Sequence, residues 1–274
     1  MTRPVHRFEN GVGVFDDQLV PEQRKRYGIR NVHEIEEEDI FLGLLRSLPP
    51  EGCFMSIGSA IGYYPLLAKR RSPRLTIHAV EPLELHRTFF LENITLNEFA
   101  PGDFTLHPFG ASRSDGSAVL VEDRFMSAIQ GGPASMYHRL RSAVRAMLVA
   151  AGLRPPERTT AIATHSLDSI VAIIGRPVDL CQMDIQGLEG AVLRGAAKAL
   201  RAEAIQTFLI GTHGRQVHRE CAALLDDAGY RIEVDQPNPK DQPDGILVAT
   251  VAAPGAMHQN RPMPDAMNSK HQKH

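Results

Sequence analysis

The sequence predicts an α/β fold in which a mostly parallel sheet carries helices on both faces. Short apolar runs alternate with segments of helical period along most of the chain, which is typical of repeated βαβ units. A turn with two glycines follows the first apolar run, residues 53–57, and a carboxylate, Glu81, ends the second. Open α/β sheets bind nucleotides at the carboxyl ends of such strands. These observations together indicate a nucleotide-binding α/β domain.

Length and composition indicate one large globular domain. The chain has 274 residues, of which 43% are hydrophobic and 23% charged, as in ordinary globular proteins. The net charge of −2 gives no field that would attract nucleic acid. No segment approaches the ~20 apolar residues of a membrane span, and the N-terminus lacks the apolar stretch of a signal peptide. We therefore expect a cytoplasmic protein with no nucleic-acid or membrane partner.

The three cysteines and the chain ends complete this outline. Three cysteines without C-x-x-C spacing favour core packing in a reducing compartment. Residues 1–33 are polar with scattered Gly and Pro, and we expect them to form a loosely ordered arm around a domain at 34–253. Residues 254–274 have no apolar period and are predicted to be a disordered tail. The sequence does not indicate an oligomeric state.

The elements of the domain follow in order. A helix opens it, because Phe41, Leu45 and Leu48 recur at helical spacing after an acidic run, and Pro49 ends it. Strands are predicted at 53–57, 75–80 and 105–109, with helices after Gly62 and at 84–97. After an interruption, helices are predicted at 167–174, 189–200 and 217–228, and strands at 178–185, 205–212, 230–234 and 246–251. No helix separates the last two strands, so they predict an antiparallel hairpin at a sheet edge.

The interruption, at about residues 112–160, is interpreted as an insertion or cap. A strand at 119–122, a glycine-rich loop at 131–133 and a helix at 136–153 are expected within it.

The glycine turn indicates a nucleoside without a pyrophosphate. Gly58 and Gly62 give the spacing G-x-x-x-G, whereas dinucleotide sites have G-x-G-x-x-G, and Ala60 stands where a further glycine would be needed. Glu81 follows at the interval expected for a ribose ligand, since an ionised carboxylate can accept bonds from both ribose hydroxyls. An ordinary tight turn and a solvated charge at a strand end remain the alternatives.

Two polar residues end later strands and are expected to reach the same crevice. Asp184 ends the fourth core strand, and His213 follows the fifth. A histidine titrates near neutrality and suits a general base, although a structural histidine at a strand end is as common. Glu189 opens the next helix, where an acid is ordinary. Asp184, Glu189 and His213 could hold a divalent cation, but no ligand spacing supports it.

Together these residues resemble the FkbM family of S-adenosylmethionine-dependent methyltransferases. The resemblance runs from about residue 34 to residue 251, apart from much of 110–160. It rests on the ordered segments HEIEEEDIFLGLL, MSIGSAIGYYPLLA, HAVEPLELHRTFFLENITLN, THSLDSI and MDIQGLEGAVLRGA, and on the strand into THG.

This resemblance implies a class I methyltransferase fold, a Rossmann-like arrangement of seven mostly parallel strands with one antiparallel edge strand. It also implies a helical lead-in and an insertion after the third strand. The activity it implies is methylation of a hydroxyl on a sugar or secondary metabolite, with a small-molecule acceptor as partner.

The resemblance also assigns site residues. The turn would line the methionine part of the donor, Glu81 would hold the ribose, and the residues after the second and third strands would flank the adenine. The expected donor contacts are Ser56, Ile57, Gly58, Ser59, Gly62, Glu81, Pro82, Leu83, Gly110, Ala111 and Asp184. Asp184 matches the aspartate of the family's D-x-E-G-x-E segment, in which Gln186 replaces the first glutamate. Family members usually have Asp at the position of Ser56 and an acid near Gly211.

For catalysis we expect His213 to act as the base and Asp184 to orient it or the acceptor. The insertion residues Tyr137, His138, Arg139 and Arg141 are candidates to cap the acceptor, and their charge would favour a uronate or phosphosugar. Two alternatives stay open. Glu81 would also suit the ribose of NAD in an oxidoreductase, and the departures at Ser56, Gln186 and Gly211 would suit a degenerate donor-binding module without activity.

Overall fold

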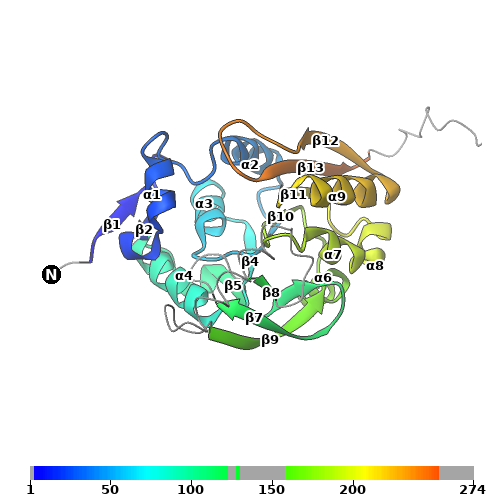
Figure 1. Cartoon of the computed structure of the whole chain (residues 1–274), viewed down its shortest axis with the longest axis horizontal. Helices are drawn as coiled ribbons and strands as arrows, with labels where there is room; N and C mark the ends of the chain where they lie inside the picture. The colour runs from blue at the N-terminus through cyan, green and yellow to red at the C-terminus, as the bar shows by residue number, and fades with distance from the viewer. Residues whose placement is uncertain (1–2, 123–127, 130–157, 253–274) are drawn as a thin grey trace, which may run out of the picture.

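A seven-stranded sheet forms the centre of the computed structural model, which describes residues 3–122, 128–129 and 158–252 (Figure 1). The strand order is β12-β13-β11-β10-β3-β4-β5. Its strands are β3 (Cys53–Ile57), β4 (Thr76–Val80), β5 (Phe104–His107), β10 (Leu180–Met183), β11 (Thr207–Thr212), β12 (Tyr230–Gln236) and β13 (Gly245–Val251). The pairs from β11 to β5 are all parallel. The predicted α/β class is confirmed.

Helices cover both faces of this sheet, and each face has its own hydrophobic core (Figure 1). One face packs against α2 (Ile35–Ser47), α3 (Tyr63–Arg71) and α4 (Glu84–Leu96), and the other against α6 (Leu167–Ile174), α7 (Glu189–Arg194), α8 (Ala197–Arg201) and α9 (Arg215–Asp227). Strand β3 shows the reason. Phe54 belongs to the first core, whereas Cys53, Met55 and Ile57 belong to the second, because successive side chains of a strand alternate between faces.

The predicted closing hairpin of β12 and β13 is confirmed. However, β13, the strand that runs antiparallel to the rest of the sheet, lies one position in from the sheet edge. β13 pairs antiparallel with both β11 and β12, so β12 is the edge strand. Burial explains this order. Ile246, Leu247 and Val248 form a continuous apolar run that both faces bury, whereas β12 alternates and exposes Arg231 to solvent. An edge strand tolerates such charges and a central one does not.

The N-terminal segment is ordered, so the expected loosely ordered arm is wrong. It forms β1 (Val5–Arg7), β2 (Gly13–Phe15), the short helix η1 (Asp16–Gln18) and α1 (Pro21–Tyr27), which lie beside α3 and α4 (Figure 1). Phe8, Val12 and Leu19 are buried in the first core. Asn97 fixes β2 through two bonds to Gly13, which donates to Asn97 Oδ1 at 2.8 Å and accepts from Nδ2 at 2.7 Å. Most of its few apolar residues are packed, whereas Val5 and Ile29 are exposed.

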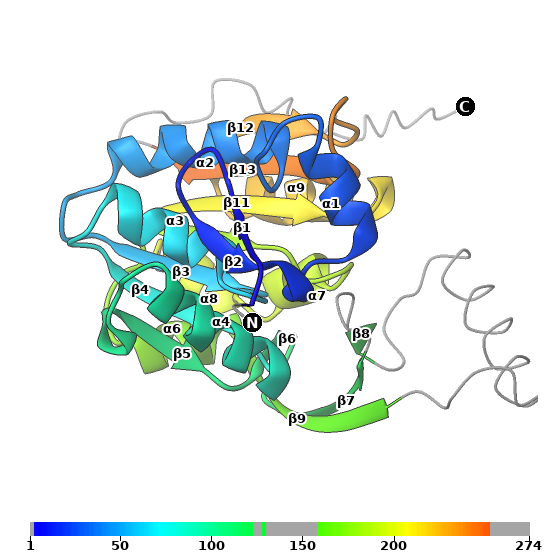
Figure 2. The same ribbon diagram turned by 90° about the vertical axis from the view of Figure 1, so that its left-hand side faces the viewer.

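The insertion after β5 begins and ends as a second sheet. Its strands are β6 (Gly110–Ser112), β7 (Gly116–Glu122), β8 (Ala128–Ile129) and β9 (Arg158–Ser166), in the order β6-β9-β7-β8. Figure 2 shows β7, β8 and β9 on the side toward which β11 points. The strand expected at 119–122 is confirmed within β7, and β9 was not predicted. The expected loop and helix at 131–153 and the tail at 254–274 lie outside the described residues.

Two further details concern the helices. The single helix expected at 189–200 is divided into α7 and α8 at Gly195, where a Cβ would meet the backbone oxygens of Ser112 and Arg113. In the described part of the chain, every helix is too short or too polar to cross a bilayer.

Candidate functional site

A cavity of about 500 Å³ opens at the carboxyl ends of the central strands. Most of the residues expected at the site line it, namely Ser56, Ile57, Gly58, Ser59, Glu81, Pro82, Gly110, Ala111, Asp184 and His213. Gly62 and Leu83 do not line it. Gly62 instead lies against the Phe90 ring, which a Cβ at this position would overlap, and Leu83 packs beside Leu120 and Ile162. The parallel sheet therefore gathers residues from distant segments into one cavity.

The glycine turn is shaped by close backbone approach. Gly58 has φ +82°, and a Cβ there would overlap the backbone oxygen of Asp184, so only glycine fits. Asp184 in turn donates its amide to Ile57 at 3.0 Å, which joins the ends of β3 and β10. Ala60 takes φ +44° without being glycine. The turn therefore brings the loops after β3 and β10 into direct contact at the cavity.

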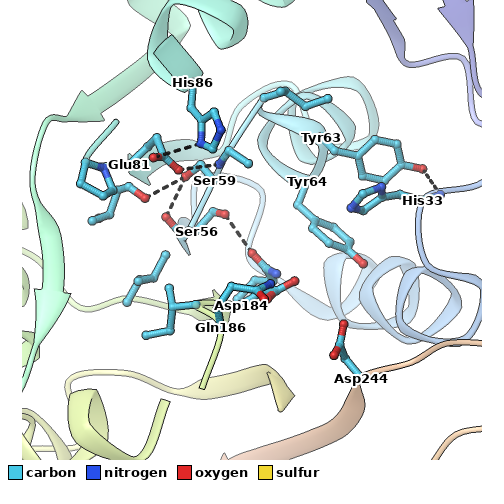
Figure 3. Close-up of a pocket in the computed structure, with 18 of the residues that line it drawn as sticks. His33, Ser56, Ser59, Tyr63, Tyr64, Glu81, His86, Asp184, Gln186 and Asp244 are labelled. Carbon is cyan, nitrogen blue, oxygen red and sulfur yellow. Dashed lines mark hydrogen bonds and ion pairs between the residues drawn. The ribbon is translucent and has the colours of Figure 1, made fainter. Parts of the chain in front are cut away.

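Glu81 is fixed by backbone amides at one end of the cavity. Its Oε2 accepts from Ala60 N and its Oε1 from Leu83 N, both at 2.9 Å, and His86 Nδ1 lies 3.3 Å from Oε1 (Figure 3). The residue is only 5% exposed. A carboxylate oxygen accepts more than one hydrogen bond, so both oxygens retain capacity for ligand hydroxyls. The carboxylate is thus held in a fixed orientation with capacity to accept bonds from ligand hydroxyls.

Ser56 belongs to a buried polar chain that the sequence did not reveal. Its Oγ donates to Gln182 Oε1 at 2.9 Å, and Gln182 Nε2 donates to Glu37 Oε1 at 3.4 Å. The Glu37 carboxylate also fills the space next to Gly211, where a Cβ would lie 3.3 Å from Oε2. A carboxylate from α2 therefore stands beside the strand end at which the family usually has its own acid. The lone polar Gln182 within an apolar strand was the available signal.

The opposite end of the cavity is acidic, and sequence reasoning missed most of it. Figure 3 shows His33, Tyr64 and Asp244 across the cavity from Glu81. Glu34 also lines this end and pairs with Arg26 at 2.8 Å. Burial raises the pKa of Glu34 to about 8 although Arg26 opposes the shift. In the sequence, Glu34 belongs to an acidic run that also suits a helix start, and Asp244 belongs to a turn-rich segment. Neither pattern distinguishes these two residues from ordinary surface acids.

His213 is enclosed by carboxylates. Its Nδ1 lies 2.8 Å from Glu189 Oε1, and its Nε2 lies 3.5 Å from Asp184 Oδ1 and 3.4 Å from Asp244 Oδ1. Burial lowers the pKa of His213, but the Glu189 hydrogen bond and the surrounding carboxylates outweigh it and raise the pKa to about 10. Burial also raises the pKa of Asp184 to about 6, against the opposing effect of His213. The surrounding carboxylates therefore favour the protonated imidazole, which does not suit the expected general base.

The three residues named as a possible cation site do converge. Asp184, Glu189 and His213 each offer an atom within 4.8 Å of the others. Glu189 does not line the cavity but lies fully buried behind His213. The candidate acceptor residues Tyr137, His138, Arg139 and Arg141 lie outside the described residues.

Comparison with known proteins gives a family match. The model of the Methyltransferase FkbM domain matches residues 53–232, more than half of the chain. A curated protein of Jannaschia sp. (strain CCS1), named "Putative methyltransferase", is 30% identical over 97 residues, which are 32% of this chain and 34% of that protein. The chain thus matches about a third of the length of that relative.

Solved structures give weaker likenesses. A methyltransferase FkbM from Methylobacillus flagellatus KT has a TM-score of 0.47 and 13% identity, over 75% of this chain and 45% of that chain. A magnesium protoporphyrin IX methyltransferase from Synechocystis PCC 6803, with bound SAM, has a TM-score of 0.49 and 10% identity, over 85% of this chain and 86% of that chain.

Proposed function

Because the chain belongs to the FkbM methyltransferase family, we propose that it methylates a hydroxyl of a small molecule, a sugar or secondary metabolite, with S-adenosylmethionine as donor. One observation carries this proposal. The Glu81 carboxylate is buried, fixed by the amides of Ala60 and Leu83, and shares a cavity with Asp184 and His213. A ribose ligand and a reactive polar pair thus face the same space.

The residues of the cavity fit this donor. Glu81 would accept the two ribose hydroxyls, and Pro82, Gly110 and Ala111 form the neighbouring wall for the adenine. Ile57, Gly58 and Ser59, with Ser56 behind them, would lie along the methionine part. When bound, the donor supplies a methyl group on a positively charged sulfur. The protein's main contribution is then alignment, since a near-attack geometry can contribute ~7 to 11 kcal/mol.

Asp184 and His213 take roles opposite to those expected from the sequence. Both nitrogens of His213 face carboxylates, which favours the protonated ring in the absence of a bound ion, so His213 is a poor acceptor for the hydroxyl proton. Asp184 Oδ1 is buried without a hydrogen-bond partner among the described residues, and it lines the cavity. We assign Asp184 as the proton acceptor for the hydroxyl and His213 as the group that orients it.

The charge of the described lining favours a neutral acceptor. Asp184 and Asp244 line this end beside the Arg26–Glu34 pair, and the His213 ring is already enclosed by Glu189, Asp184 and Asp244, so no cation of the described lining is left to pair with an anionic acceptor. A uronate or phosphosugar would approach these carboxylates unfavourably. The proposal is therefore a neutral hydroxyl compound.

Calorimetry with S-adenosylhomocysteine and with NAD tests the donor class. We expect the homocysteine compound to bind one site per chain and NAD to give no heat of binding. Tight NAD binding with no response to the homocysteine compound would favour the oxidoreductase instead. A screen of neutral hydroxyl acceptors with methyl-labelled S-adenosylmethionine then tests catalysis, with an Asp184→Asn variant as the inactive control.

The degenerate-module alternative makes a separate prediction at Ser56. If the missing aspartate were a defect, Ser56→Asp would tighten donor binding. We expect no gain, because an aspartate would face Gln182 Oε1, which now accepts from Ser56 Oγ at 2.9 Å. Measured affinities for S-adenosylhomocysteine decide this, and a Ser56→Ala variant serves as the control for loss of the hydroxyl alone.

A further inference from the structure

We propose that His213, Asp184 and Asp244 bind a divalent metal ion of the Mn²⁺ class at the acceptor end of the cavity, with Glu189 holding the histidine ring behind it. Binding of this ion does not depend on the proposed methyl transfer. The role of the ion in catalysis does rest on the proposed function, because an ion at this position lies where the acceptor hydroxyl is expected.

Unpartnered atoms meet at this point. His213 Nε2 and Asp184 Oδ1 are both buried, and neither has a hydrogen-bond partner within the part of the chain that the structure describes. Leaving such a group unpartnered is unfavourable, so buried polar atoms usually have a protein, water or ion partner. Here two such atoms lie on facing side chains that line a cavity. This arrangement indicates a partner that both atoms would share.

The spacing is that of ligands around an ion. His213 Nε2 lies 3.5 Å from Asp184 Oδ1 and 3.4 Å from Asp244 Oδ1. Ordinary N–H···O bonds are ~2.7–3.2 Å long, so these contacts are longer than hydrogen bonds. Two ligands at right angles around a cation with bonds of ~2.1–2.3 Å are about 3 Å apart. The carboxylates therefore need only a small movement to bind the same ion as the imidazole.

The support behind the ring has the arrangement found at metal centres. Metal-binding histidines usually donate their other N–H to a carboxylate, which fixes the tautomer and the ring orientation. Here His213 Nδ1 lies 2.8 Å from Glu189 Oε1, and Glu189 is fully buried. The same oxygen accepts from Gly187 N at 3.1 Å and Ile185 N at 3.3 Å. Glu189 is thus immobilised by the turn that follows Asp184, and it aims Nε2 at the two aspartates.

The ligand set selects the class of ion. One imidazole nitrogen with two carboxylates suits a borderline to hard cation such as Mn²⁺, and the two negative charges would neutralise it. Such an ion would keep positions for water or the acceptor hydroxyl, whose proton it would make easier to remove. The competing arrangement is a metal-free ion-pair network in which Nε2 keeps its proton.

Titration of the full chain with Mn²⁺, after removal of metal with a chelator, separates the two arrangements. We expect electron paramagnetic resonance and calorimetry to report one Mn²⁺ per chain with a dissociation constant below about 1 mM. Asp244→Asn and His213→Gln should each weaken binding at least ~10-fold. Glu34→Gln is the matched comparison, because Glu34 lines the same end of the cavity but pairs with Arg26 and is not a proposed ligand, and its loss of binding should be clearly smaller than that of either ligand variant.

Two results would overturn the site. One is the absence of stoichiometric Mn²⁺ binding by the folded protein. The other is an equal loss in Glu34→Gln and Asp244→Asn, which would show general attraction to an acidic cavity. Circular dichroism tests whether each variant is folded. If one ligand variant does not fold, Asp184→Asn is measured in its place. A protein that binds S-adenosylhomocysteine but does not bind Mn²⁺ would refute the metal site and leave the proposed function standing. A protein that binds Mn²⁺ but not S-adenosylhomocysteine would support the metal site and refute the proposed donor.

Discussion

At the scale of single residues, the proposed donor end of the cavity depends on how Glu81 is held. Two amides, from Ala60 and Leu83, each donate to one oxygen of the carboxylate, so its orientation is fixed before a ligand binds. The preceding strand delivers Glu81 to the cavity, and the glycine turn supplies one of the amides. Local sequence was enough to identify this residue, because strand, turn and carboxylate all lie within a short segment.

A Glu81→Gln variant should bind S-adenosylhomocysteine about 10- to 100-fold more weakly. Hydrogen bonds to a charged group contribute about 1.5–3 kcal/mol, and the amide has only one acceptor oxygen. Isothermal calorimetry measures the change. Glu84→Gln, at the exposed start of α4, is the control and should bind like the unmodified protein. An unchanged affinity in Glu81→Gln would remove the ribose assignment.

Glu37 makes a pH-dependent contribution to stability. Burial raises its pKa to about 8 from 4.5, so the folded state resists ionisation. The unfolded chain ionises near its ordinary value, and stability is therefore present at low pH and lost as the pH rises from about 4.5 to about 8. Because the residue is only 2% exposed, the loss is on the order of a few kcal/mol.

Glu37→Gln should remove this loss. Melting temperatures followed by circular dichroism should be nearly equal for variant and parent at about pH 4, and the variant should be higher by several degrees at about pH 8. Glu51→Gln, whose side chain is 81% exposed, should show no such trend. A difference that is constant with pH would show that Glu37 is already ionised in the fold.

At the scale of elements, the N-terminal segment is part of the domain and also a wall of the cavity. The cavity is lined by Gln18 of η1, by Arg26 of α1 and by Val20 in the link between these helices. Their sequence is too polar and too rich in Gly and Pro to predict this. The few apolar residues are spaced without a helical or strand period, and their burial depends on packing in one core with residues of α3 and α4.

Phe8→Ala tests whether this segment is integral. The centroid of the Phe8 ring lies 5.0 Å from that of Tyr27 and 4.7 Å from that of Tyr63, and Phe8 is 4% exposed. Loss of a buried phenylalanine typically costs ~3–5 kcal/mol. Urea denaturation should show this cost, whereas Ile29→Ala, at a residue that is 82% exposed, should change stability by less than about 0.5 kcal/mol. Similar values for the two variants would place the segment outside the cooperative fold.

At the scale of the whole molecule, the cavity lies where both halves of the sheet meet the N-terminal segment and the second sheet. Its lining comes from residues as far apart as Gln18 and Asp244. A ligand there would contact most parts of the fold at once. Binding should therefore stabilise the entire domain rather than one loop.

S-adenosylhomocysteine at about 100 times its dissociation constant should add about 2.7 kcal/mol to the free energy of unfolding. For a domain of this size, that corresponds to a rise in melting temperature of roughly 5 to 10 °C. NAD at the same concentration should leave the melting temperature unchanged, and Glu81→Gln should lose most of the shift. A single transition is expected throughout; a second, ligand-insensitive transition would show that the N-terminal segment melts separately.

The sequence by itself determined the α/β class, the strand that carries Glu81, the glycine turn and the family, and these were confirmed because each depends on short-range pattern. Tertiary structure alone decided the acidic end of the cavity. Glu34, Glu37 and Asp244 come from segments that also suit helix starts and turns, and their function depends on which neighbours the sheet order brings to them. The same physics underlies the proposed exchange of roles between Asp184 and His213, because the carboxylates that surround a histidine in space, and not its position in the chain, decide which protonation form is favoured.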